Sequence, residues 1–220
     1  GNMYSTVQIG GQCWMRNNLR TTHYADGTAI PTGNISSSDP YYYDSQSNRL
    51  DLAIRGYHYN QPAVMHNQTS STANPSGVQG VCPDGWHVPS ENEWQQLFTF
   101  VGSQVQHVCD NNYIEIAKAL ASPTGWRDNG NTCQLGNDVN NNLTGFTAFP
   151  TGQWQNDMSC WGTDFVCTFW SSTAGRPFTP GTSPQIGNAN GYYGFPVRCV
   201  YDISACGTEF EGTHNVETDT

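Results

Sequence analysis

Charged side chains are scarce in this sequence. Of its 220 residues, 8 are Lys or Arg and 18 are Asp or Glu, and Lys118 is the single lysine. The charged fraction of 12% is about half of the usual ~25%, so the surface must consist largely of Asn, Ser, Thr, Gln and Gly. With a net charge of -10 and no basic stripe to contact phosphates, the chain lacks the features of a nucleic-acid-binding protein.

Long apolar runs and common catalytic motifs are also missing. No apolar run approaches the ~20 residues that a membrane-spanning helix needs. No signal peptide is visible, so we expect an exported form to have lost its leader. The sequence has no G-x-S-x-G motif, no phosphate-binding glycine loop and no dinucleotide fingerprint. Zinc catalysis is not favoured, because the histidines stand singly rather than at ligand spacing: His23, His58, His66, His87, His107 and His214.

Cysteine, in contrast, is well represented. The eight cysteines form no C-x-x-C pair of the kind that binds structural zinc. Together with the near absence of lysine, this pattern favours disulfides formed in an oxidising compartment. We therefore expect an extracellular or outer cell surface location, and the sequence leaves open whether a lipid anchored the protein before processing.

The chain has the composition of one folded domain. Its hydrophobic content of 36% and aromatic content of 12% are sufficient to bury a core. We find no tandem repeat and no domain linker, so we expect a single domain over residues 1–202. Residues 203–220 contain Cys206 and then an acidic stretch with few apolar residues, which predicts a strap followed by a frayed terminus.

The local patterns favour many short strands and two helices. Runs with β-like alternation or aromatic enrichment lie between clusters of Gly, Asn, Pro and Ser, at residues 4–15, 56–65, 145–154, 164–173 and 192–202. One helix is predicted to begin after Ser90, with Glu93 completing a capping box, and to end near Gly102. The other is predicted from about Asn112 to Ala121, just before Ser122-Pro123. Two helices among short strands indicate an α+β domain.

Residues 81–94, VCPDGWHVPSENEW, allow two interpretations. Cys82 and His87 could act as nucleophile and base, or the segment could be a structural entry into the first helix. In the structural interpretation, Trp86 and Trp94 anchor the core and His87 is a half-buried ring whose nitrogens bond nearby backbone. We favour the structural interpretation.

Several segments resemble the Fibrobacter succinogenes major paralogous domain, and their order and spacing match over roughly residues 3–202. They are residues 13–31, 56–60, 81–94, 145–152, 169–173 and 194–202. The resemblance implies an exported or surface protein of Bacteroidetes or Fibrobacteres, whose fold is similar to C-type lectins and to the formylglycine-generating enzyme. The expected architecture is two helices packed on short, twisted antiparallel strands with long loops, held by disulfides.

The resemblance also suggests how the cysteines pair. In a C-type-lectin-like fold the cysteine before the first helix commonly meets one on the last strand, which implies a Cys82–Cys199 bridge. Proximity in sequence favours Cys160–Cys167 and Cys109–Cys133, leaving Cys13–Cys206, although eight cysteines allow 105 connectivities. A bridge closing more than a hundred residues should stabilise the fold by roughly 4 to 5 kcal/mol, and a bridged Cys82 is no nucleophile.

In this fold the loops of the C-terminal half form the ligand face, which corresponds here to residues 153–168 and 174–193. These loops combine rigid aromatic side chains with adaptable polar ones, as antibody loops do. The alternative is that the tryptophans belong to the core and the adjacent tyrosines to a strand. The expected ligand-binding residues are Trp154, Asn156, Asp157, Trp161, Arg176, Phe178, Asn188, Asn190, Tyr192 and Tyr193.

No cofactor is expected, but calcium is considered because lectins of this fold bind it through Asn, Asp and Glu oxygens. The candidate clusters are Asn137, Asp138 and Asn140, and the pair Asn156 and Asp157. Neither contains the EPN, QPD or WND triplets of sugar-binding C-type lectins, so polar turn caps are the favoured interpretation.

We therefore predict a binding or adhesion module without catalytic activity that recognises a glycan or a protein on another cell or in the matrix. The alternative is a structural subunit of a surface appendage or envelope, in which the loops pack against neighbouring subunits. An oxidase similar to the formylglycine-generating enzyme is less favoured, because the residues around Cys160, Cys167 and Cys199 do not match that enzyme's motif.

Overall fold

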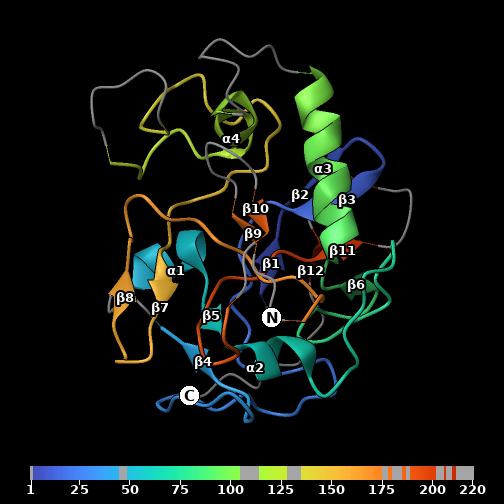
Figure 1. Ribbon diagram of the computed structural model, residues 1–220, viewed down its shortest axis with the longest axis vertical. Helices are drawn as coiled ribbons and strands as arrows, with labels where there is room; N and C mark the ends of the chain where they lie inside the picture. The colour runs from blue at the N-terminus through green and yellow to red at the C-terminus, as the bar shows by residue number, and fades with distance from the viewer. Residues whose placement is uncertain are drawn as a thin grey trace.

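The protein combines short helices with small antiparallel sheets (Figure 1). The computed structural model describes residues 2–44, 49–104, 114–127, 135–174, 178–179, 185–186, 189–201, 206 and 210–211. The helices are α1 (Arg49–Arg55), α2 (Gln61–Met65), α3 (Glu91–Gln104) and α4 (Ile114–Leu120). The strands are β1 (Met3–Tyr4), β2 (Thr6–Ile9), β3 (Gln12–Met15), β4 (Tyr42–Tyr43), β5 (His58–Tyr59), β6 (Trp86–His87), β7 (Gln153–Trp154), β8 (Cys160–Trp161), β9 (Phe178–Thr179), β10 (Gln185–Ile186), β11 (Val200–Tyr201) and β12 (Phe210–Glu211).

The largest sheet has four antiparallel strands in the order β2-β3-β11-β6. Strands β2 and β3 form a hairpin across Gly10 and Gly11, and Gly10 has a φ of 60° that glycine adopts without strain. Every side chain of β3 is buried. Because side chains alternate across a strand, this strand contributes to a core on both faces of the sheet.

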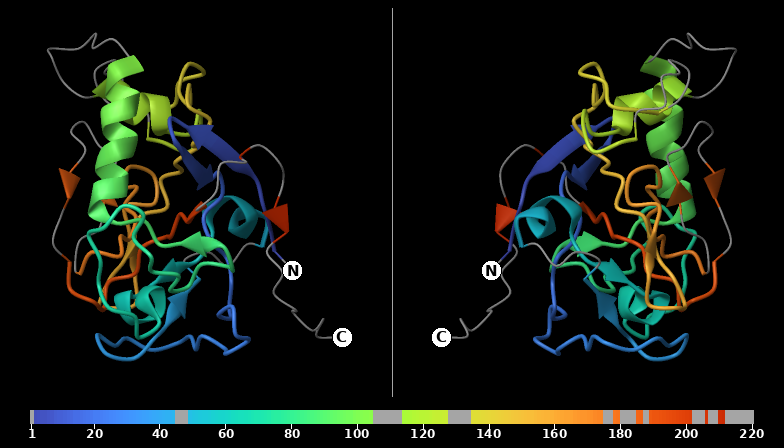
Figure 2. Two further views of the ribbon diagram at one scale, coloured as in Figure 1. Left: turned by 90° about the vertical axis from the view of Figure 1, so that its right-hand side faces the viewer. Right: turned by 90° about the vertical axis from the view of Figure 1, so that its left-hand side faces the viewer.

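The core accordingly divides into two clusters. Cys13 and Met15 of β3 belong to a cluster that also contains Val64 of α2 and the Cys82–Cys199 pair. Trp14, which points to the other face, belongs to a cluster with side chains of α3 and α4. Figure 2 shows these two helices side by side at one end of the molecule, next to the β2–β3 hairpin. The sheet therefore lies between the helical pair and the loop-rich half of the protein.

Helix α3 begins where the sequence predicts it. The Ser90 hydroxyl accepts the Glu93 amide at 3.3 Å, and the Glu93 carboxylate accepts the Ser90 amide at 2.9 Å, which is a capping box. The expectations that Trp86 and Trp94 are core residues are confirmed. The interpretation of His87 needs correction, because its ring is fully buried and its Nε2 lies 2.5 Å from Glu93 Oε1 rather than against backbone.

The described residues contain four helices rather than the expected two. Helix α2 follows β5 inside a run that was predicted as a strand, because Asn60 caps the amide of Ala63, Pro62 lies in its first turn, and His66 ends it in the left-handed region. Helix α1 has seven residues and α2 has five. Helices of these lengths are too short for helical periodicity to be recognised in the sequence. The α+β class is unaffected by these additions.

Two disulfides hold the described part of the chain, and both are among the expected pairs. Cys82 joins Cys199, and Cys13 joins Cys206. The segment after residue 202 is thereby tied back to β3, and β12 also pairs with β1. The expected partners Cys109 and Cys133 lie outside the described residues.

The expected Cys160–Cys167 bridge is wrong, since both residues are thiols. Cys160 lies opposite Trp154 in the β7–β8 hairpin. The backbone of Cys167 forms an isolated β-bridge with Gly152, and its side chain is buried in the cluster that contains Trp14. A compact turn between the two cysteines sends their side chains to different environments. Among the described helices, none has both the length and the apolar character required to cross a membrane.

Candidate binding surface

The β7–β8 hairpin carries the first of the two predicted ligand loops. Its turn closes with the Gln155 amide donating to the Ser159 carbonyl at 2.8 Å, and Met158 adopts a φ of 62°. The Asp157 carboxylate accepts both the amide and the hydroxyl of Ser159, and these hydrogen bonds lower the pKa of Asp157. Asp157 therefore caps the turn, while its neighbour Asn156 is exposed.

An exposed group of side chains lies at the end of β8 and in the turn after it, where Arg127 joins from a distant segment. We call Arg127, Trp161, Asp164 and Phe165 the aromatic patch. Trp161 is 52% exposed and Phe165 is 41% exposed, and their rings meet edge to face with centroids 4.9 Å apart. Arg127 lies 4.7 Å from the centroid of the Phe165 ring and holds the Asp164 carboxylate through two hydrogen bonds of 2.8 and 3.1 Å. The patch therefore presents two large aromatic rings beside a bidentate ion pair.

Backbone hydrogen bonds make this surface rigid. The amides of Phe165 and Val166 both donate to the carbonyl of Gly162, and the Arg127 amide donates to the Asp164 carbonyl at 2.6 Å. Arg55, at the end of α1, donates to the carbonyls of Pro150 and Thr163 from the other side. Because the rings stand on a fixed backbone, little conformational entropy is lost when a partner contacts them.

Trp154, another predicted ligand residue, is mainly structural. Its ring stacks on buried Tyr43 with centroids 5.1 Å apart and planes 6° from parallel. Its backbone exchanges hydrogen bonds with Gly194 at 2.8 and 3.1 Å. A Cβ at Gly194 would lie 2.7 Å from the Trp154 Cβ, so glycine is required for this close approach. The prediction that Trp154 contacts a ligand is not supported by this half-buried position.

The second predicted loop is described from residue 189 to residue 193. Tyr192 and Tyr193 are both half-buried, with ring centroids 4.7 Å apart, and Tyr193 also packs on the core. Asn190 is exposed and lies 3.5 Å from the Tyr192 hydroxyl. The Gln61 amide donates to the Gly191 carbonyl, which fixes this loop to the start of α2. The loop is thus adjacent to α2, whereas the aromatic patch, which includes Arg127, is adjacent to Arg55.

Part of the predicted ligand face lies outside the described residues. Arg176 and Asn188 lie outside the described residues, and of Phe178 only its backbone in β9 is described. Phe165 and Arg127 were missed by the sequence analysis. Phe165 lay in a run predicted to be a strand, and Arg127 is separated from it by many residues. Arg127 gave no sequence signal, because only the fold brings it next to Asp164 and Phe165.

The predicted calcium ligands have other partners. Asn137 Oδ1 accepts the Trp126 amide at 2.9 Å, and Asp138 Oδ1 accepts the amide and side-chain nitrogens of Asn140. These bonds and the nearby Lys118 ammonium, 3.7 Å from Asp138 Oδ2, lower the pKa of Asp138. The three side chains therefore act as turn caps, and a calcium ion would have to compete with Lys118. Among the described residues, no group of three or more His, Cys, Asp or Glu side chains could hold a metal ion.

Cys160, Cys167 and Cys199 lie in three different environments. Cys167 is buried, and burial raises the pKa of its thiol to about 12, which keeps it protonated at neutral pH. Cys160 is half-buried and its Sγ contacts the Thr151 carbonyl at 3.5 Å. Cys199 forms a disulfide with Cys82 and therefore has no thiol.

Comparison with known protein families provides a match that spans the central sheet and the aromatic patch. Residues 7–201 match the Fibrobacter succinogenes major domain. Comparisons with curated proteins and with solved structures find no match. Because the matched range covers most of the sequence, this chain belongs to the Fibrobacter succinogenes major domain family.

Proposed function

We propose that the protein is an extracellular binding module of C-type-lectin-like fold, without catalytic activity, that contacts a glycan or a protein through its aromatic patch. The observation that carries the proposal is the pair of exposed rings, Trp161 and Phe165, held beside the Arg127–Asp164 ion pair. Tryptophan and arginine are the residues most enriched at binding hot spots. Removing the two aromatic rings from water favours the binding of a partner.

The lectin-like fold is supported by the position of the Cys82–Cys199 bridge. It connects the segment before α3 with the residue before β11, as the family resemblance implies. Disulfides form and persist in oxidising environments, which supports a location outside the cytoplasm. The burial of Cys167 and the bridge at Cys199 argue against an oxidase that would need accessible thiols at these positions.

The experiment compares native protein with Trp161→Ala on a glycan array and on a panel of immobilised extracellular-matrix proteins. Trp161 is the suitable position because its side chain is exposed, whereas removal of Trp154 would also disturb its stack on Tyr43. We expect Trp161→Ala to weaken binding by about 30-fold or more, as for a hot-spot residue.

The matched control is Val139→Ala, which truncates a side chain that is 90% exposed on a different loop. This variant should bind like the native protein. Equal affinity of Trp161→Ala and native protein for their ligand would exclude the patch as the contact surface. Self-association that depends on Trp161, with no ligand on either panel, would instead favour a structural subunit.

A further inference from the structure

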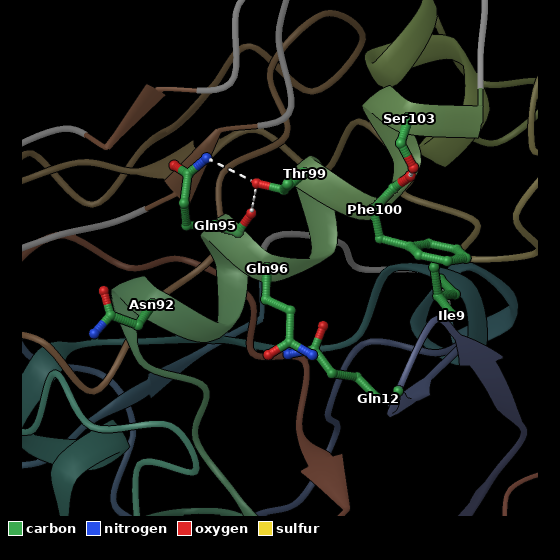
Figure 3. Close-up of a pocket in the computed structure, with 9 residues that line it drawn as sticks. Ile9, Gln12, Asn92, Gln95, Gln96, Thr99, Phe100 and Ser103 are labelled. Carbon is green, nitrogen blue, oxygen red and sulfur yellow. Dashed lines mark hydrogen bonds between the residues drawn. The ribbon is translucent and has the colours of Figure 1, made fainter.

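A groove separate from the aromatic patch runs between the β2–β3 hairpin and the exposed face of α3 (Figure 3). Its volume is about 560 Å³. Figure 1 places β7 and β8 on the other side of the view from α3. The polar lining consists of uncharged amide and hydroxyl groups: Gln12, Asn92, Gln95, Gln96, Thr99 and Ser103. No ionisable side chain is among the described residues that line it.

The floor of the groove contains a buried acceptor without a partner. Gln12 is only 6% exposed, and its Nε2 donates to the Glu93 carbonyl at 3.0 Å. That bond fixes the orientation of the amide, because the reversed amide would place an oxygen against the Glu93 carbonyl. Gln12 Oε1 is buried and accepts no hydrogen bond from any described residue. Buried acceptors are normally paired, so this atom is suited to a donor supplied by a ligand.

A donor also lines this groove. The Gln96 Oε1 accepts from Asn74 Nδ2 at 2.5 Å, which directs the Gln96 amide nitrogen to the groove side. A Cβ built on Gly11 would lie 3.8 Å from that nitrogen, and Figure 3 shows the Gln12 and Gln96 side chains pointing toward each other. A hydroxyl group between them would donate to Gln12 Oε1 and accept from Gln96 Nε2, and a sugar hydroxyl has both capacities.

An aromatic ring borders the groove. Phe100 is 40% exposed, and one side of its ring rests on Gly10, where a Cβ would lie 3.0 Å from the ring. The same ring lines an adjoining groove of about 340 Å³, together with Gln8, Gln104 and Thr144. The apolar faces of sugar rings stack on aromatic side chains. Phe100 lines both hollows, which together offer room for more than one sugar unit.

We propose that this groove binds a neutral oligosaccharide, with a ligand hydroxyl between Gln12 and Gln96 and a sugar ring against Phe100. Acidic sugars are disfavoured because the lining has no cation to pair with them and the chain carries a net charge of -10. The site is independent of the aromatic patch, and its existence does not require the proposed function of that patch.

The test is titration of isotope-labelled protein with neutral hexasaccharides of glucose, mannose and xylose, followed by the NMR shifts of the glutamine side-chain amides. The acidic control is a galacturonic acid hexasaccharide. We expect at least one neutral probe to shift the Gln12 and Gln96 amides, and the acidic probe to shift neither. Absence of these shifts with every neutral probe at about 10 mM would overturn the proposal.

Variants separate this site from the patch. Gln96→Ala and Phe100→Ala truncate exposed side chains, and each should weaken the binding by about 10-fold or more. Gly11→Ala places a methyl group in the groove while every hydrogen bond is retained. This variant should also weaken the binding of the neutral probe. Trp161→Ala should bind the neutral probe like native protein. Native affinity in correctly folded Gln96→Ala and Phe100→Ala would contradict the proposal, whatever the result for the patch.

Discussion

Arg198 is a charged side chain placed almost entirely inside the protein. It is 1% exposed, and its guanidinium donates to Asn18 Oδ1 and to the carbonyls of Met15, Phe146 and Thr147. It also lies 4.6 Å from the centroid of the Phe146 ring. Burial lowers its pKa to about 9, so it is still charged at neutral pH. These carbonyls belong to segments far apart in the sequence, and the planar guanidinium joins them.

We predict that Arg198→Lys destabilises the fold by about 3 kcal/mol or more. Lysine keeps the charge but has three donors on one atom, so it leaves buried carbonyls unpaired. Chemical denaturation measures the effect. The control is Arg20→Lys, whose guanidinium is at the surface and donates to the Met3 carbonyl; its cost should be below about 1 kcal/mol. A similar cost for both variants would contradict this role of Arg198.

His58 makes stability depend on pH. The ring is fully buried, with Nε2 3.2 Å from the Gly152 carbonyl, and burial lowers its pKa from 6.5 to about 4. Between these values the unfolded chain binds a proton that the folded protein does not. The stabilisation is therefore complete above about pH 6.5 and is lost as the pH falls toward 4, by up to about 3 kcal/mol.

We predict that His58→Gln reduces the loss of stability between pH 6.5 and 4, as measured by urea unfolding at several pH values. Glutamine can still donate to the Gly152 carbonyl but does not titrate. The control is Thr151→Val, which alters a buried neighbour without removing a titratable group and should keep the native slope. An unchanged slope in His58→Gln would contradict the assignment.

The environment of a single residue was predictable where one physical effect dominates. Trp86 and Trp94 were expected in the core because large rings next to a helix start seek burial, and the structure confirms it. The partner of His87 was predicted wrongly because a buried ring can bond backbone or carboxylate equally well. Glu93 was already recognised as a capping residue, but its second oxygen reaches His87, and only the tertiary structure reveals that contact.

At the scale of elements, the start of α3 depends on a small network. Glu93 accepts the amides of Ser90 and Ser76 through Oε2 and contacts His87 Nε2 through Oε1. Ser90 caps the Glu93 amide and donates to the Ala73 carbonyl. The helix start, β6 and the loop at residues 73–76 are therefore held by one buried carboxylate.

We predict that Ser90→Ala costs about 1 kcal/mol, the usual value of an N-cap, whereas Glu93→Ala costs about 3 kcal/mol or more because it leaves buried groups without their acceptor. Guanidinium denaturation followed by far-UV circular dichroism measures both. The network would be refuted if the two variants were equally stable.

Helices were predictable in proportion to their length and capping chemistry. The sequence indicates α3 from its cap and its apolar repeat, and α4 from its repeat and Ser122-Pro123. Helices α1 and α2 are short and are stabilised by tertiary contacts, such as the hydrogen bond from Asn18 Nδ2 to the Arg55 carbonyl. Strand-like runs were located correctly near β2, β3, β5 and β11. Residues 164–173, which were also predicted as a strand, are instead held by isolated β-bridges such as Gly152–Cys167 and by side-chain hydrogen bonds.

Considered as a whole, the molecule relies on cross-links between distant parts of the chain. The Cys82–Cys199 bridge spans 117 residues and the Cys13–Cys206 bridge spans 193. Both connect elements on the same side of the central sheet. The family resemblance was sufficient to infer the first pair, whereas sequence proximity misled the pairing of Cys160 with Cys167.

We predict that replacing Cys82 and Cys199 together by alanine lowers the free energy of unfolding by about 4 kcal/mol, since the unfolded chain regains the freedom of a long loop. Differential scanning calorimetry measures the loss. Cys160→Ser, a conservative change at a cysteine that belongs to neither described disulfide, should change stability by less than about 1 kcal/mol. An equal effect of both changes would show that the bridge does not constrain the fold.

The candidate surface was predicted in part. The loop from residue 153 to residue 168 does contain an exposed aromatic group, and Trp161 belongs to it. Trp154 is half-buried and stacks on Tyr43, as the alternative core interpretation expects, and the aromatic patch is completed by Arg127 from a distant segment. The groove beside α3 gave no sequence signal, since its polar residues resemble any solvated helix face.

The central claim is that the aromatic patch contacts an external ligand. Its most direct test is the dissociation constant of native protein and of Trp161→Ala for one ligand identified on the glycan array or the matrix panel. The account predicts binding that weakens by about 30-fold or more in a variant with native stability. Undiminished affinity in that folded variant would contradict it.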